Sequence, residues 1–292
     1  MNILSFDVGG TQIKYGIVTQ DGEVLTAVVV DTPKQAGGAG LIECLCELVR
    51  HMQQQHQIEG IAISTFGLVD VDSGLILGAA EAVPGYAGVS PKAALSQEFG
   101  LPVSIDNDVN CVALAEGWRG AAQGVAHYIA VAIGTGIGGG IVLNHQIYRG
   151  HRAAAGEWGY MKIDGLIWED HASMRGLLAA ANAVDPNAFT DGRAVFAAYD
   201  AQVPLIVPVV QDWFKLLARG IANLIYALNP ERVVIGGGVS ARGAVFLDEL
   251  NAAINAQLLP DFQGMTEVVL ASAGNHAGMI GAARNWLQTN KY

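Results

Sequence analysis

Short apolar runs alternate with longer amphipathic segments along the whole chain, and this pattern is typical of an α/β protein. In the first part of the chain, predicted strands cover residues 2–8, 12–19, 23–32, 60–66 and 102–106, and predicted helices cover 39–57, 91–99 and 108–119. In the second part, predicted strands cover residues 126–133, 140–148, 232–236 and 266–271, and predicted helices cover 169–183, 190–200, 204–228, 241–258 and 275–289.

One motif occurs twice. The segment 6–18, Phe-Asp-Val-Gly-Gly-Thr-Gln-Ile-Lys-Tyr-Gly-Ile-Val, resembles the segment 131–142, Val-Ala-Ile-Gly-Thr-Gly-Ile-Gly-Gly-Gly-Ile-Val. Each reads as a strand, a Gly/Thr turn and a second strand, and each opens a run of strands followed by helices. The repetition predicts two similar α/β domains with a cleft between them. We expect a small domain made of residues 1–118 with 275–292, and a large domain made of residues 119–274.

Composition narrows the possible functions. Hydrophobic residues make up 51% of the chain and charged residues 15%, as in a globular protein, and glycine is abundant with 37 of 292 residues. The net charge of −11 argues against nucleic acid or an anionic membrane as a partner. A nucleotide can still bind, because backbone N–H groups and a metal ion hold phosphates without many cationic side chains.

Cysteine usage and the apolar stretches indicate a cytoplasmic protein. Three cysteines, an odd and sparse set, argue against a disulfide framework. The first residues carry no basic region followed by a long apolar run, so we expect no signal peptide. Residues 120–148 lack Asp, Glu, Lys and Arg, but the glycines in their middle favour two strands and a turn over a transmembrane helix.

Three glycine-rich turns are candidate nucleotide contacts. The first two, Asp7–Lys14 and Gly134–Gly140, pair as similar hairpins that let backbone approach a phosphate, and Thr11 adds a hydroxyl. The third, Gly236–Ser240, follows a strand and precedes a predicted helix, which suits nucleotide contact at a helix N-terminus. None of them has the Gly-Lys-Ser/Thr spacing of a P-loop.

The segment Asp106-Asn107-Asp108-Val109-Asn110 is the candidate catalytic segment. It ends an apolar strand and begins a helix, and ligands of open α/β sheets bind at such strand ends. Phosphoryl transfer to an alcohol needs an aspartate that orients the hydroxyl and accepts its proton. One of these side chains is expected to cap the helix. The residues alone leave open whether Asp106 or Asp108 is the base.

These motifs together resemble the ROK family of sugar kinases. The matching segments, in chain order, are Asp-x-Gly-Gly-Thr at 7–11, Asn-Asp-x-Asn at 107–110, Gly-Thr-Gly-Ile-Gly-Gly-Gly at 134–140, Gly-Glu-x-Gly at 156–159 and Gly-Gly-Gly-Val-Ser at 236–240. The resemblance implies the two-domain, actin-like ATPase fold, ATP and Mg²⁺ as cofactors, and a homodimer.

The resemblance also assigns roles to residues. It implies that Asp108 is the catalytic base and that Asp7 faces the metal, Mg²⁺, either directly or through water. Nucleotide contacts are implied for Asp7, Gly9, Gly10, Thr11, Gly134, Thr135, Gly136, Gly237 and Gly238. Sugar contacts are implied for Thr65, Gly67, Asn107, Glu157, Tyr160 and Glu169.

The chain departs from the family pattern at its zinc motif. The histidine of the usual Glu-x-Gly-His segment is replaced by Tyr160, and the cysteines of the usual zinc motif are absent before Ala172-Ser173. A closed tetrahedral zinc site cannot be built from what remains, so we expect no zinc. Zinc-free members that this chain resembles include bacterial β-glucoside kinases. We therefore expect phosphorylation of glucose or a β-glucoside at O6, with Tyr160 and Trp158 offering an apolar face near the anomeric end.

Several other functions compete with this interpretation. Within the kinases, the runner-up is N-acetylmannosamine kinase, with fructokinase third. A ROK-type sugar-sensing regulator would need a DNA-binding segment, yet the first predicted strand already begins at Asn2 and the charge is −11. A catalytically inactive sugar-binding or assembly protein is disfavoured by the retained Asp7, Asn107 and Asp108.

Overall fold

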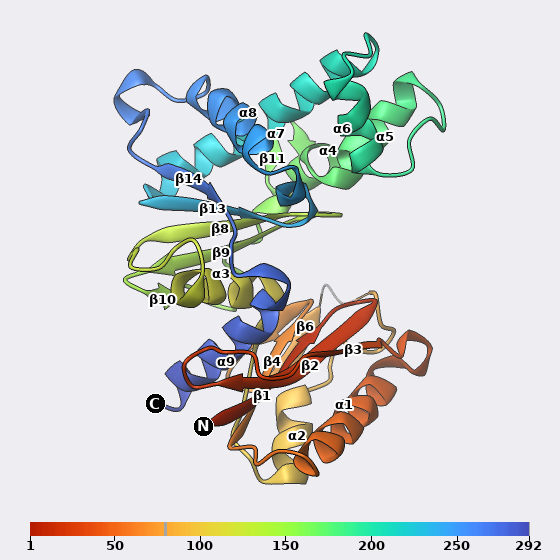
Figure 1. The fold of residues 1–292 in the computed structure, drawn as a ribbon, viewed down its shortest axis with the longest axis vertical. Coiled ribbons are helices and arrows are strands. Elements are labelled where there is room, and N and C mark those ends of the chain that lie inside the picture. The colour runs from red at the N-terminus through yellow and green to blue at the C-terminus, as the bar shows by residue number, and fades with distance from the viewer. Residues whose placement is uncertain (79–80, 292) are drawn as a thin grey trace. The chain divides into compact units, whose positions relative to one another are not determined.

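The computed structural model describes residues 1–78 and 81–291, which fold into two compact units (Figure 1). The first unit consists of Met1–Gly124, Gln146–Ala155 and Ser272–Tyr292, and the second of Val125–His145 and Gly156–Ala271. The ten-residue segment Gln146–Ala155 thus belongs with the first unit, although the sequence around it belongs with the second. A division into domains at residues 118/119 and 274/275 stays a prediction.

A five-stranded sheet with the order β3-β2-β1-β4-β7 forms the centre of the first unit. Its strands are β1 (Asn2–Val8), β2 (Gln12–Thr19), β3 (Val28–Asp31), β4 (Gly60–Thr65) and β7 (Val103–Asn107). Strands β1 and β2 form an antiparallel hairpin, and β4 and β7 run parallel to β1. The remaining elements are the hairpin β5 (Leu68–Asp70) and β6 (Leu75–Gly78), the short β10 (Gln146–Ile147), and the helices α1 (Gly37–Gln53), α2 (Pro91–Phe99), α3 (Asp108–Arg119) and α9 (Ala277–Thr289).

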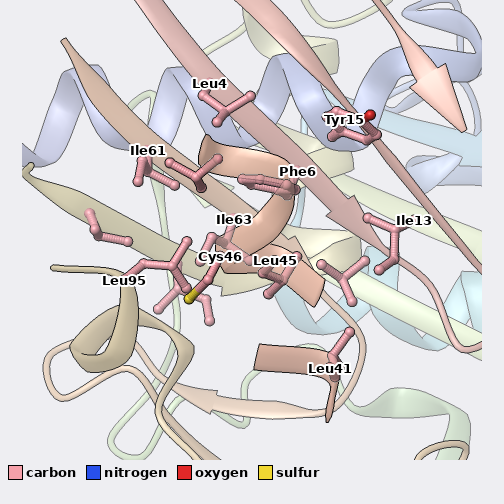
Figure 2. Close-up of a cluster of buried hydrophobic side chains, with 14 of the residues drawn as sticks. Leu4, Phe6, Ile13, Tyr15, Leu41, Leu45, Cys46, Ile61, Ile63 and Leu95 are labelled. Carbon is pink, nitrogen blue, oxygen red and sulfur yellow. The ribbon is translucent and has the colours of Figure 1, made fainter. Parts of the chain in front are cut away.

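Helices cover both faces of this sheet because its strands are apolar on both sides. Leu4 and Phe6 of β1 pack with Leu41 and Leu45 of α1 in one cluster, whose labelled members are shown in Figure 2. Ile3, which points to the opposite face, packs with residues of α3 and α9. Alternate residues of each strand therefore face opposite helix layers, and this alternation decides where the polar residues at the strand ends point.

Helices α3 and α9 pack closely because α9 carries small residues on the contacting side. A Cβ on Gly281 would overlap the carbonyl oxygen of Cys111, so only glycine allows this approach. Trp286 of α9 packs on Gly60 in the same way and donates from its indole nitrogen to the carbonyl of Pro102 at 2.8 Å. The C-terminal helix is thus fixed against the sheet and against α3.

The second unit repeats the topology of the first. Within this unit the sheet order is β9-β8-β13-β14, with an antiparallel hairpin followed by two parallel strands, as in β2-β1-β4-β7. Its strands are β8 (Tyr128–Ile133), β9 (Ile137–Leu143), β13 (Arg232–Gly236) and β14 (Glu267–Leu270), together with the small hairpin β11 (Lys162–Ile163) and β12 (Leu166–Ile167). The duplication expected from the sequence is therefore confirmed at the level of strand order and direction.

The helices of this unit are α4 (Trp168–Ala172), α5 (Met174–Val184), α6 (Gly192–Asp200), α7 (Ile206–Leu228) and α8 (Ala244–Asn255). Two expectations were wrong here. The single helix expected over 169–183 is broken at Ser173, whose extended backbone lets its side chain cap α5 through the N–H of Gly176. The segment after β13 forms a 3₁₀ turn, Gly238–Arg242, before α8 begins, so the glycine-rich turn precedes a 3₁₀ turn and not an α-helix directly.

Across the described residues, the structure contains no helix that is long and apolar enough to cross a membrane. The uncharged stretch 120–148 forms mainly β8 and β9, as the glycines in it predicted.

Candidate active site

Three parallel strands of the first unit bring their polar C-terminal ends side by side. The register aligns Asp7 of β1 with Ser64 of β4, and Ser64 with Asp106 of β7. The hydroxyl of Ser64 donates to Asp7 Oδ1 at 3.1 Å. Because side chains alternate along a strand, these three residues share the sheet face that α3 and α9 cover.

Asp106 and Asp108 differ sharply in environment. Asp106 is 1% exposed, and both of its oxygens are fully used. Its Oδ1 accepts from the N–H of Asn107 at 2.8 Å and from Asn110 Nδ2 at 2.9 Å. Its Oδ2 accepts from Arg149 Nε at 2.8 Å and Nη2 at 2.6 Å. Asp108 is the first residue of α3, is only partly buried, and accepts from the N–H of Val109 at 2.9 Å.

Asn107 is the residue that caps α3. Its Oδ1 accepts from the N–H of Val109 at 2.9 Å and of Asn110 at 3.3 Å, which fixes the first turn of the helix beneath Asp108. Its Nδ2 donates to the carbonyl of Gly67 at 3.1 Å. The amide has a second hydrogen on Nδ2, so it retains donor capacity for a ligand.

Thr65 lies deeper than expected for a sugar contact. It is 0% exposed, and its hydroxyl is 2.9 Å from the hydroxyl of Tyr86. Gly67 adopts a φ of 94°, in the left-handed region that favours glycine. Thr65 therefore fixes the turn from inside, and Gly67 shapes the turn and bonds to Asn107.

Asp7 lies close beneath the start of α9. A Cβ on Gly278 would overlap the carboxyl group of Asp7, so this glycine makes room for the acid. Lys14 Nζ lies 3.6 Å from Asp7 Oδ2 and donates to the carbonyl of Asn275 at 3.1 Å. A single carboxylate of this kind fits Mg²⁺, which is held in kinases by one or two carboxylates, waters and nucleotide phosphates.

The turn between β1 and β2 is built for close approach of a ligand to backbone. Gly9 donates to the carbonyl of Gln12 at 2.9 Å, and the hydroxyl of Thr32 donates to the carbonyl of Gly9 at 2.7 Å. Thr11 is exposed at the tip, where Lys34 Nζ donates to its hydroxyl at 3.2 Å. Lys34 supplies a positive charge beside the turn and was missed from the sequence, because it lies in a separate 3₁₀ segment.

The turn between β8 and β9, which is the equivalent turn of the second unit, is hydrogen-bonded to Glu169. Gly134 donates to the carbonyl of Gly136 at 3.0 Å, and Glu169 Oε2 accepts from the N–H of Ile137 at 3.2 Å. A Cβ on Gly136 would lie 2.5 Å from that carboxylate oxygen. Glu169 Oε1 lies 3.7 Å from Arg175 Nη2. The sequence-predicted residues Gly134, Thr135, Gly136 and Glu169 therefore form one cluster.

Glu157 lies next to this cluster. Partial burial raises the pKa of Glu157, and the charge of Glu169 raises it further. Trp158 is 4% exposed, packs on Gly139 of β9 and donates to the carbonyl of Gly138 at 3.3 Å. The expected apolar face from Trp158 is therefore wrong, because the ring is buried against glycines. Tyr160 is 60% exposed.

A pocket of about 390 Å³ opens beside the third glycine-rich turn. Met174, Phe196, Asp200, Gly238 and Arg242 are among the residues that line it. Arg242 forms ion pairs with Asp200 and Glu249, and its guanidinium lies 4.7 Å from the centre of the Phe196 ring. The contribution of α5 and α6 to this pocket had no recognisable motif in the sequence.

Within residues 1–78 and 81–291, no three or more His, Cys, Asp or Glu side chains gather in a group that could hold a metal ion. The three cysteines are free thiols, consistent with the absence of a disulfide framework in the sequence pattern.

The ROK family model matches residues 3–289, nearly the whole chain. The chain belongs to the ROK family. It is 36% identical over 298 residues to a β-glucoside kinase of Klebsiella pneumoniae, and the alignment covers 99% of this chain and 97% of the relative. Relatives that are named kinases match this chain along nearly its whole length, so it is a sugar phosphotransferase.

Solved structures of ROK proteins agree with this assignment. A ROK hexokinase from Thermus thermophilus superposes with a TM-score of 0.87 at 30% identity, over 100% of both chains. A proposed N-acetylmannosamine kinase from Listeria monocytogenes gives a TM-score of 0.87 at 32% identity, over 99% and 100% of the chains. A Streptomyces griseus glucokinase in complex with glucose and AMPPNP gives 0.80 at 29%, over 97% and 98%. The expected actin-like ATPase fold is thereby confirmed.

Proposed function

We propose that this ROK kinase transfers the γ-phosphoryl group of ATP to the 6-hydroxyl of glucose or of a β-glucoside, with Asp108 as the base. The observation that carries the assignment of the base is the contrast between the two aspartates. The carboxylate of Asp106 is buried and engaged by Arg149, Asn107 and Asn110. Asp108 lies at the partly exposed start of α3, where a substrate can reach it.

The reaction needs one proton acceptor and one bond exchange. Asp108 accepts the proton of the sugar hydroxyl while the hydroxyl oxygen forms a bond to the γ-phosphorus of ATP. The bond between that phosphorus and the oxygen that links it to ADP breaks. Asn107 caps the helix that carries Asp108 and offers a remaining N–H to a sugar oxygen. The backbone turn at Gly67 is held in place by the same amide.

Nucleotide binding is assigned to residues of both units. In the first unit these are Asp7 and the turn Gly9–Thr11, with Lys34 beside Thr11. In the second unit they are Gly134, Thr135, Gly136, Gly237 and Gly238, and the neighbouring pocket has the size of a small-molecule site. Asp7 is the carboxylate that would hold Mg²⁺ through water, and the ion would supply positive charge that offsets the negative charge developing on the transferred phosphoryl group.

Sugar contacts in the second unit are assigned to Glu157, Glu169 and Tyr160. The two carboxylates lie close enough for Glu169 to raise the pKa of Glu157. Tyr160 replaces the histidine expected in this family and is exposed, so it can face the anomeric end of the sugar. The similarity to a β-glucoside kinase supports a site that accepts an anomeric substituent.

The similarity to a proposed N-acetylmannosamine kinase favours that activity as the second candidate. A panel of sugars assayed for ADP release decides between them, with glucose, cellobiose, methyl β-glucoside, N-acetylmannosamine and fructose as acceptors. We expect glucose or a β-glucoside to have the highest kcat/KM. A higher kcat/KM for N-acetylmannosamine would replace the proposed substrate while leaving the kinase chemistry in place.

A further inference from the structure

Arg242 ends the third glycine-rich turn and is paired with acids on two helices of the second unit. The 3₁₀ turn Gly238–Arg242 lies between β13 and α8. One guanidinium nitrogen of Arg242 donates to Asp200, the last residue of α6, and another donates to Glu249 of α8. The Arg242 side chain is only 12% exposed, so the two carboxylates replace much of the water around its charge.

The same guanidinium contacts the aromatic side chains of α6. Its central carbon lies 4.7 Å from the centre of the Phe196 ring and 5.7 Å from the centre of the Tyr199 ring. A cation over a ring face is favourable within about 6 Å. Helix α6 is therefore held to the end of the glycine-rich turn by one carboxylate and two rings.

The turn that carries Arg242 has an ordered backbone. Gly237 has a φ of 87°, and a Cβ on it would lie 2.3 Å from the carbonyl oxygen of Ile133 in β8. Ser240 donates to the carbonyl of Gly237 from its N–H at 3.1 Å and from its hydroxyl at 2.8 Å. The N–H of Gly243 donates to the carbonyl of Ser240 at 3.0 Å. Because its backbone is fixed, Arg242 can fix α6 relative to the turn.

The pocket of about 390 Å³ is lined by both of these elements. Helix α6 contributes Phe196 and Ala197 to one wall, and the turn contributes Gly238 and Val239 to the other. Arg242 and its partner on α6 also line the pocket. This ion pair therefore joins the two walls and sets the distance between them.

The pocket adjoins both of the glycine-rich turns in the second unit that are assigned to the nucleotide. Gly238 is itself a lining residue. Met174 is another, and its N–H donates to the carbonyl of Gly134 at 2.9 Å. The pocket is thus next to the backbone groups proposed to hold the phosphates.

The lining suits the base of a nucleotide better than its phosphates. Several lining residues are apolar, among them Met174, Phe196 and Val239. The charge of Arg242 is already balanced by two carboxylates, so it attracts an anion only weakly. Arg193 also lines the pocket, but it is exposed and lies at the other end of α6 from Asp200. Mostly apolar pockets with a few polar groups are typical of sites for small aromatic molecules.

We propose that Arg242 is a positioning residue for the nucleotide, which holds α6 at the distance from the third glycine-rich turn that the base requires. The inference rests on the proposed use of ATP and names the residue that sets the width of the pocket beside the phosphates. Arg242 lies two positions beyond the segment 236–240, so it is outside the motifs that resemble the family.

The test compares Arg242→Met, which keeps the length of the side chain and removes its charge, with Arg242→Lys, which keeps a charge. Inhibition constants are measured against ATP, at saturating glucose, for ADP and for inorganic tripolyphosphate, which has no base. In Arg242→Met we expect the constant for ADP to rise about tenfold, the effect of losing hydrogen bonds between charged groups. Arg242→Lys should restore part of the affinity, with a rise of about threefold, because an ammonium lacks the fork that binds two acids. The constant for tripolyphosphate, the KM for glucose and kcat should stay within about twofold of wild type.

Two further variants complete the test. The matched control is Arg219→Met, which removes an arginine of α7 that pairs with Asp164 and lies outside the lining of the pocket. All constants of the control should stay within about twofold of wild type. Asp200→Asn keeps the pair between Arg242 and Glu249 and removes only the charge on α6, so it tests the inference even if Arg242→Met does not fold. We expect it to raise the constant for ADP about threefold, and a thermal melt shows which variants are folded.

The outcomes separate this inference from the proposed function. Equal rises for ADP and tripolyphosphate would mean that Arg242 supports the phosphate turn and not the base, and the inference would be wrong. It would also be wrong if the folded variants bind ADP as tightly as the wild-type enzyme. In both cases the kinase assignment stands, because the wild-type enzyme still transfers phosphate from ATP. A wild-type enzyme that uses no nucleoside triphosphate would contradict both this inference and the ATP part of the proposed function.

Discussion

Arg149 holds Asp106 with two hydrogen bonds to the same carboxylate oxygen, from Nε at 2.8 Å and from Nη2 at 2.6 Å. The acid is 1% exposed, whereas a quarter of the Arg149 side chain is exposed. The pair lies directly before the helix that carries Asp108. It thus fixes the end of β7, and with it the start of α3.

This pair should be important for stability. We expect Asp106→Asn to lower the free energy of unfolding by about 3 kcal/mol, because it leaves the partly buried guanidinium without its charge partner. Asp108→Asn, at a partly exposed helix start, should change it by less than about 1 kcal/mol. Urea denaturation of both variants measures the difference. Equal stabilities would mean that the Asp106–Arg149 pair does not fix this region.

For catalysis we expect the reverse order, with Asp108→Asn costing more activity than Asp106→Asn. We expect Asp108→Asn to lower kcat at least ~100-fold with little change in sugar and ATP binding, since a general base contributes about 10²–10⁴-fold. Single-turnover measurements with glucose and ATP, together with calorimetric binding, test this. The assignment of the base is wrong if Asp108→Asn stays active and a folded Asp106→Asn enzyme does not.

Sequence patterns predicted most elements of this fold because the core strands and helices are strongly periodic. The bounds of β1, β2, α2 and β13 match the expected ranges. The short hairpin β5–β6 was missed because three- and four-residue strands carry too few residues to show a period. The break at Ser173 was missed because a capping serine inside an apolar run is a weak local signal.

Only those residues of the candidate site that belong to recognisable sequence motifs could be predicted. Asp7, Asn107 and Asp108 follow strands in recognisable motifs, but Arg149 reaches Asp106 across 43 positions of sequence. The single sequence feature that distinguishes Arg149 is that it is the first charged residue after the uncharged stretch 120–148. The glycines of β9 were expected to contact phosphate. In the structure the Trp158 ring packs directly against Gly139, so this glycine makes room for the ring.

That contact gives a prediction about Gly139. We expect Gly139→Ala to destabilise the protein by about 1–3 kcal/mol, because its Cβ would overlap the Trp158 ring and overpacking forces side chains or backbone to shift. Gly134→Ala is the matched control, since nothing lies within 4 Å of a Cβ at that position. Thermal unfolding compares them. A Gly139→Ala protein as stable as the control would show that the indole can move away freely.

Metal content distinguishes a site that contains the family's structural zinc from a zinc-free site that needs only Mg²⁺. We expect activity to require Mg²⁺ and the purified protein to hold no zinc, because the cysteine ligands of the family's zinc motif are absent from the sequence. Elemental analysis and titration of activity with Mg²⁺ after EDTA treatment test both parts. About one tightly held zinc per chain would contradict the interpretation of residues 157–173.

The pH dependence of kcat/KM should reveal Glu157. Partial burial and then the charge of Glu169 raise its pKa, so it takes up a proton at a higher pH than an ordinary glutamate, whose pKa is about 4.3. As an ionised acceptor of sugar hydroxyls, Glu157 should support sugar binding above its raised pKa and lose this role as the pH falls through it. The raised pKa also affects folding stability. Between the pKa of Glu157 in the unfolded protein and its higher pKa in the folded protein, the folded state binds more protons, so the contribution of Glu157 to the free energy of unfolding falls as the pH rises through that window.

The measurement is a profile of kcat/KM for glucose between about pH 4 and pH 8, at saturating ATP. Wild-type activity should decline on the acid side at a pH above about 4.3, the ordinary value for glutamate. Glu157→Gln removes the titrating group while keeping an oxygen that accepts hydrogen bonds, so its weaker activity should persist to lower pH. If the acid limb is the same in both enzymes, another group controls it, and Glu157 does not act as an ionised sugar ligand.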